Sequence, residues 1–105
     1  MSNNPMMRAM EEFTRTLASD QPPANLDAAF AGLWWDAKGD WDKAHACVDS
    51  CIDEAGIRVH AYLHRKEGDL ANAAYWYGRV GRTAPDISLA AEGEALLHDL
   101  LVSER

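Results

Sequence analysis

The stretch Val59–Arg82, VHAYLHRKEGDLANAAYWYGRVGR, decides the fold of this chain. Gly68-Asp69 divides the stretch into two segments of helix-forming residues, and no run alternates between apolar and polar residues as a strand would. Glycine commonly ends a helix, and aspartate caps the start of the next one. The stretch therefore predicts a helical hairpin with a tight turn at Gly68-Asp69.

The same turn occurs 29 residues earlier, at Gly39-Asp40. In each copy a small residue lies seven positions before the glycine and an alanine lies five positions after it. These residues are Gly32 and Ala44 in the first copy, and Ala61 and Ala73 in the second. Small residues at both positions allow paired helices to approach closely. The sequence therefore predicts two helical hairpins, each with a tight crossing.

This pattern resembles the tetratricopeptide repeat over about residues 28–85. The residues that carry the resemblance are Gly32, Trp35, Gly39, Trp41 and Ala44 in the first copy, and Ala61, Gly68, Ala73, Tyr77 and Pro85 in the second. The run at 74–80, AYWYGRV, looks like the second helix of Sel1-like repeats. The period of 29 is shorter than the usual ~34 residues. The stretch HAYLHRKEGD with NAAYWY is also similar to a group of small bacterial proteins for which no activity is established.

The whole chain, residues 1–105, is predicted to be one all-α domain of about six helices. An N-terminal helix is expected within 1–19, starting at Asn4-Pro5 and ending before the break at 20–23. The first hairpin is placed at 25–56, with helices over 25–38 and 41–55 and a stop at Gly56, and the second at 57–82. A C-terminal helix is expected over 86–105, opened by Pro85-Asp86. Repeat hairpins leave faces uncovered, so the first and last helices are expected to act as caps.

Composition restricts the class of protein. A chain of 105 residues, 48% of them hydrophobic, suits one globular domain. No apolar run approaches the ~20 residues of a membrane span, and no secretory signal is visible, so no membrane partner is expected. The only thiols, Cys47 and Cys51, favour a reducing cytoplasm over a disulfide framework, and they are expected to be buried and inert.

Charge is distributed unevenly along the chain. The net charge of −7 argues against nucleic acid as a partner. Residues 58–82 nevertheless carry a net charge of +3, between flanks of −6 over 1–57 and −4 over 83–105. This basic segment either pairs with its acidic flanks or forms a site for an anion.

Arg58, Tyr62 and Arg65 follow one another at spacings of four and three, which places them on one helix face. In tetratricopeptide-like stacks this face lines the concave groove that receives peptides. Two guanidiniums beside a phenol suit a carboxylate or phosphate. Two interpretations remain open: a groove for an acidic partner, or an arginine face that is solvated or paired within the chain.

His60 and His64 are four residues apart and project from one helix face. This spacing suits a metal ion, with His45 or Glu67 as further ligands. The repeat alignment instead places both histidines at core positions, which favours buried, neutral, hydrogen-bonded rings and predicts no metal and no cofactor. The alternative is a site for a small anion, a metal or proton chemistry that comprises His60, His64, Glu67 and Tyr75.

Aromatic residues are concentrated in both hairpins. Consecutive helical side chains point about 100° apart, so Tyr75, Trp76 and Tyr77 cannot all face the core. Trp76 and Tyr77 are expected inside and Tyr75 outside. The four tryptophans form either a packed aromatic seam or a patch for a partner.

The leading functional hypothesis is a cytoplasmic, non-enzymatic interaction module. It would bind a protein or peptide with acidic residues along the groove of Arg58, Tyr62 and Arg65, or form a homodimer through an aromatic patch. The alternative is a small-ligand, metal-binding or catalytic protein that uses the histidine site. No nucleophile elbow, phosphate-binding loop, HExxH motif or dinucleotide fingerprint occurs, which weakens an enzymatic assignment.

Overall fold

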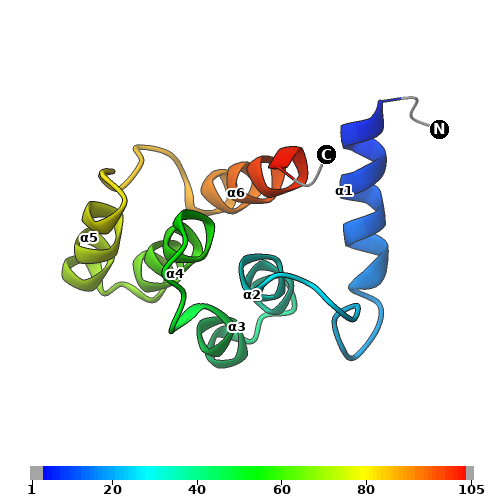
Figure 1. Ribbon diagram of the computed structural model, residues 1–105, viewed down its shortest axis with the longest axis horizontal. Coiled ribbons are helices and arrows are strands. Elements are labelled where there is room, and N and C mark those ends of the chain that lie inside the picture. The colour runs from blue at the N-terminus through cyan, green and yellow to red at the C-terminus, as the bar shows by residue number, and fades with distance from the viewer. Residues whose placement is uncertain (1–3, 104–105) are drawn as a thin grey trace.

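A computed structural model describes residues 4–103, which form six α-helices and contain no strand. The helices are α1 (Pro5–Thr16), α2 (Ala28–Ala37), α3 (Trp41–Val48), α4 (Glu54–Glu67), α5 (Leu70–Arg79) and α6 (Leu89–Ser103). The predicted all-α class is therefore confirmed. Helices α2 and α3 pack as one hairpin and α4 and α5 as another. Along the longest axis the helices run from α5 at one end, through α4, to α1 at the other (Figure 1).

The two outer helices, α1 and α6, pack on the rest of the chain in different ways. Helix α6 packs on both α4 and α2, and α1 packs on α6 (Figure 1). The indole of Trp34 in α2 donates a hydrogen bond from Nε1 to Thr16 Oγ1 at 3.1 Å. Lys38 Nζ donates to the carbonyl oxygens of Leu17 and Ser19 just after α1. These bonds hold the C-terminal end of α1 to the first hairpin. No helix among the described residues is long and apolar enough to cross a bilayer.

Local sequence signals account for both hairpin turns. Gly39 and Gly68 have φ values of 83° and 91°, a left-handed conformation that glycine adopts without a Cβ clash. The carboxylate of Asp40 accepts a hydrogen bond from the backbone N–H of Lys43, and that of Asp69 accepts one from Asn72. Each Gly-Asp pair therefore ends one helix and caps the next.

The hairpins cross closely at the small residues. A Cβ added to Gly32 would lie 3.0 Å from Val48 Cγ1 and 3.5 Å from the carbonyl oxygen of Ala44. Ala61 and Ala73 are both buried and belong to one small cluster with Tyr77. Both crossings lie where the sequence placed them.

Several helix boundaries differ from the expected ones. Helix α3 ends at Val48 rather than at residue 55, and α2 and α6 begin at Ala28 and Leu89 rather than at 25 and 86. Helix α4 begins earlier than expected, because Asp53 caps it by accepting a hydrogen bond from the N–H of Gly56 at 3.1 Å. Gly56, predicted as a stop, lies in the first turn of α4.

Gly56 is needed because the turn between α3 and α4 packs against it. A Cβ at this position would overlap Cβ and Sγ of Cys51. We therefore expect Gly56→Ala to lower the free energy of unfolding by about 1–3 kcal/mol, despite the higher helix propensity of alanine. Gly78→Ala in α5 is the matched control, since its Cβ would meet no atom within 4 Å. The control should gain about 0.5–1 kcal/mol. Urea denaturation measures both, and a stabilising Gly56→Ala would contradict this packing.

Candidate functional site

The predicted groove residues are brought together on α4, but their polar groups are engaged within the chain. The Tyr62 hydroxyl, in a residue only 3% exposed, donates to Asp36 Oδ2 at 2.7 Å. Arg58 pairs with Asp99 of α6 at 3.1 Å. Arg65 pairs with Glu92 of α6 at 2.7 Å. Helix α6 therefore covers the face of α4 that was expected to receive a peptide.

Sequence reasoning missed Glu92, a residue of α6 that bonds to this face of α4. It is 5% exposed, and its carboxylate accepts hydrogen bonds from Arg65 Nη1 at 2.7 Å and from the Tyr77 hydroxyl at 2.6 Å. Burial, followed by the bond to Glu92, raises the pKa of Tyr77, so its hydroxyl remains a donor. The sequence did hold one signal for its burial, because Glu92, Leu96 and Leu100 follow one another at spacings of four and so share one helix face.

A cluster of three histidines joins the two hairpins. His45 of α3 meets His60 and His64 of α4, and one ring nitrogen of each lies within 4.8 Å of the others. The Nε2 atoms of His45 and His60 are 3.1 Å apart. The sequence suggested His60 and His64 together and named His45 as a further ligand. Tyr75, from the same predicted site, lies elsewhere: it is 56% exposed and contacts Trp76 and Arg79.

Glu67 orients one of these rings. Its Oε2 lies 2.7 Å from Nδ1 of His64, so we assign the Nδ1 proton to that bond. The assignment leaves a lone pair on Nε2 of His64, which lies 3.4 Å from the side-chain nitrogen of Asn72. A carboxylate that holds the outer nitrogen of a histidine is the usual support for a metal-binding imidazole.

Two tryptophans stack on rings of the histidine cluster. The Trp76 indole stacks on His60, with ring centroids 4.3 Å apart, and the Trp41 indole stacks on His45 at 4.9 Å. Trp41 is itself fixed, because its Nε1 donates to the carbonyl oxygen of Leu63 at 2.8 Å. These contacts limit the rotation of His45 and His60.

His60 is the most buried member, at 2% exposed, and its Nδ1 has no hydrogen-bond partner among the described residues. Burial, followed by the neighbouring His64 and His45, lowers the pKa of His60 to about 4. The ring is therefore neutral at pH 7. A neutral imidazole offers a lone pair to a metal ion and no positive charge to an anion.

The geometry of the cluster suits a metal ion. Zinc binds histidine nitrogens at about 2.0–2.1 Å, so two ligands of a tetrahedral site lie about 3.3 Å apart. The 3.1 Å separation of the His45 and His60 nitrogens is close to that distance and is also that of a hydrogen bond between the two rings. The three nitrogens together lie within 4.8 Å, so the rings would have to move closer around an ion. A second possible group, His64 with Glu67 and Asp69, is less suitable. Glu67 already binds His64, and Asp69 caps α5.

The two thiols take no part in this cluster. Cys47 and Cys51 are half-buried, and burial raises the pKa of both thiols. Cys51 lies beyond the end of α3, with Sγ 3.9 Å from the carbonyl oxygen of Cys47. Both thiols are therefore less buried than expected, and Cys51 lies outside the helix that carries Cys47.

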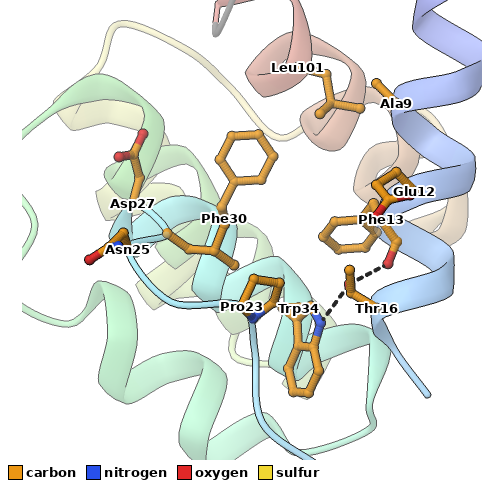
Figure 2. A pocket seen from close by; sticks show the side chains of 11 residues that line it. Ala9, Glu12, Phe13, Thr16, Pro23, Asn25, Asp27, Phe30, Trp34 and Leu101 are labelled. Carbon is orange, nitrogen blue, oxygen red and sulfur yellow. Dashed lines mark hydrogen bonds between the residues drawn. The ribbon is translucent and has the colours of Figure 1, made fainter. Parts of the chain in front are cut away.

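An apolar pocket of about 360 Å³ lies between α1, the segment that precedes α2, α2 itself and α6 (Figure 2). Phe13 and Phe30 lie on opposite sides of it, with Leu101 and Ala9 above and Pro23 below (Figure 2). Among residues 4–103, no Lys, Arg or His lines the pocket. The sequence gives no signal for it, because its walls come from four separate segments.

Comparison of the chain with protein-family models, curated proteins and solved structures finds no match. The resemblance to tetratricopeptide and Sel1-like repeats therefore remains a prediction. It depends on the residues quoted for it and on the paired helices α2 with α3 and α4 with α5.

Proposed function

We propose that this protein binds a divalent transition-metal ion through the imidazoles of His45, His60 and His64. The observation that carries the proposal is the convergence of three ring nitrogens within 4.8 Å, contributed by two separate hairpins. The bond from His64 Nδ1 to Glu67 gives independent support, since it orients that ring and leaves a lone pair on Nε2, which lies 3.4 Å from Asn72 Nδ2.

Energetics favours a functional cluster over a purely structural one. Apolar side chains of similar size would fill this space without burying three polar rings. Nδ1 of His60 has no partner among the described residues, and a buried unpaired polar atom costs about 1–3 kcal/mol, although it is Nε2 of His60 and not Nδ1 that faces His45. Such costs are typical of sites retained for binding or chemistry.

The chemistry of the ligands favours a cation over the small anion of the original alternative. The neutral ring of His60 supplies a lone pair rather than positive charge. Imidazole nitrogens suit Zn²⁺, Co²⁺, Ni²⁺ and Cu²⁺. No thiol joins the cluster among residues 4–103, so a site for a soft ion such as Cu⁺ is not indicated.

The hypothesis of an interaction module stays a prediction, separate from the metal proposal. Its groove residues lie on the face of α4 that α6 covers, whereas the histidines face α3 and Trp76 of α5. A partner that used Arg58 and Arg65 would have to replace their ion pairs to Asp99 and Glu92. Metal binding would instead displace the contact between Nε2 of His45 and Nε2 of His60, and the one between Asn72 and Nε2 of His64, neither of which is an ion pair.

Metal titration tests the proposal. We expect chelator-treated protein without a histidine tag to take up one Zn²⁺ per chain in competition with a chromophoric chelator. His45→Gln should weaken binding by at least about 100-fold, and Glu67→Gln by about 10–100-fold. His98→Gln is the matched control, since His98 lies exposed on α6 outside the cluster. Equal affinities of the wild type and His45→Gln would contradict the proposal.

A further inference from the structure

The histidine cluster is exposed to solvent on one side. His60 and His64 are buried, and Trp76 lies on the ring of His60. The side chain of His45, by contrast, is 24% exposed. An ion bound to all three rings would therefore face solvent beside His45, and the group at that position decides whether the site is open or closed.

Asp49 occupies that position. It lies one turn after His45 along α3, and its Oδ1 is 3.8 Å from His45 Nε2. Its side chain is 65% exposed, so it can change rotamer without disturbing the core. Asp49 is also the C-cap of α3, and the negative end of a helix dipole favours a bound cation.

Asp49 is not among the residues whose ligand atoms lie within 4.8 Å of one another, so its side chain would have to turn toward the ion. The carboxylates nearer to His64 are already engaged. Glu67 holds Nδ1 of His64, and Asp69 caps α5. The contact between Asp49 and His45 is longer than a hydrogen bond, and an exposed pair of this kind contributes little to stability. Little is therefore lost when the Asp49 carboxylate leaves this contact to bind a metal.

We infer that the Asp49 carboxylate is the fourth ligand, so that three imidazoles and one carboxylate enclose the ion. This inference rests on the proposed function and specifies what kind of site it is. Sites with four protein ligands hold a metal, whereas catalytic zinc sites keep one position for water or substrate. The inference therefore assigns the protein to metal retention rather than to metal-assisted hydrolysis.

Cobalt substitution tests the inference on the full-length chain. Co²⁺ gives a visible spectrum that depends on its ligands, and azide changes that spectrum when it gains an open position. We expect the wild-type Co²⁺ spectrum to stay unchanged in excess azide. Asp49→Ala should bind Co²⁺ about 10–100-fold more weakly and should respond to azide. Asp42→Ala, which removes an exposed carboxylate in the first turn of α3, is the control and should behave as the wild type.

The possible failures are distinguishable. If azide alters the wild-type spectrum as much as that of Asp49→Ala, the fourth position is open, and the assignment of Asp49 is wrong while metal binding stands. If Asp49→Ala binds Co²⁺ as tightly as the wild type and ignores azide, Asp49 is not a ligand. If the wild type binds no Co²⁺ and no Zn²⁺, the proposed function fails and the inference fails with it. Circular dichroism of each variant verifies that the helices are intact.

Discussion

Glu92→Ala is expected to lower the free energy of unfolding by about 3–5 kcal/mol, the range found when one partner of a buried ion pair is removed. Of the partners that the described residues offer the Arg65 guanidinium, the substitution would leave the carbonyl oxygen of Ile87. It would also leave the buried Tyr77 hydroxyl without its acceptor. The loss should be seen as a lower midpoint in urea denaturation.

Glu94→Ala is the matched control for this prediction. Glu94 lies two residues further along α6 and is exposed, so its loss should change stability by less than about 0.5 kcal/mol. Replacing both Arg65 and Glu92 by methionine should cost less than the sum of the single changes, because neither charge is then left unpaired. Similar losses for Glu92→Ala and Glu94→Ala would show that α6 does not pack as described.

Acidification of the metal-free protein is expected to cost on the order of 3 kcal/mol between pH 6.5 and pH 4. Burial, followed by His64 and His45, lowers the pKa of His60 from 6.5 to about 4. Below pH 6.5 the unfolded chain therefore takes up a proton that the folded chain does not accept until about pH 4. The contribution of His60 is fully present above pH 6.5 and is lost as the pH falls through this window.

A variant without the titrating ring separates this effect from that of the carboxylates. Asp49 and Glu67 also face the histidines, but they are retained when His60 is replaced by leucine. We expect His60→Leu to reduce the slope of unfolding free energy against pH between 4 and 6.5. The exposed His98→Leu should keep the wild-type slope. An unchanged slope in His60→Leu would contradict the burial and neutrality of this histidine.

The hairpins were predictable because their signals are local. A glycine with a left-handed backbone and an aspartate that caps the next helix act within a few residues, so Gly39-Asp40 and Gly68-Asp69 could be read directly. The spacing of four between His60 and His64 likewise placed two rings together. The third ring, His45, lies in the other hairpin, so the register between hairpins had to be known before the cluster was complete.

The uneven charge along the chain included intramolecular pairing as one alternative, but it did not show which residues pair. The basic segment was expected either to pair with the acidic flanks or to bind an anion, and Arg58, Arg65, Lys66 and Arg82 all pair with flank residues. Net charge cannot show that α6, rather than a partner, covers α4. The early end of α3 was also missed. The turn at 49–53 depends on Cys51 packing against Gly56, a tertiary contact that local sequence does not show.

X-ray absorption at the zinc edge of protein loaded with one equivalent of Zn²⁺ tests the central claim most directly. The account predicts histidine nitrogens at about 2.0–2.1 Å, with the scattering pattern of three imidazole rings in the wild type and of two in His45→Gln. A first shell of oxygen atoms alone, or a spectrum that His45→Gln leaves unchanged, would contradict it.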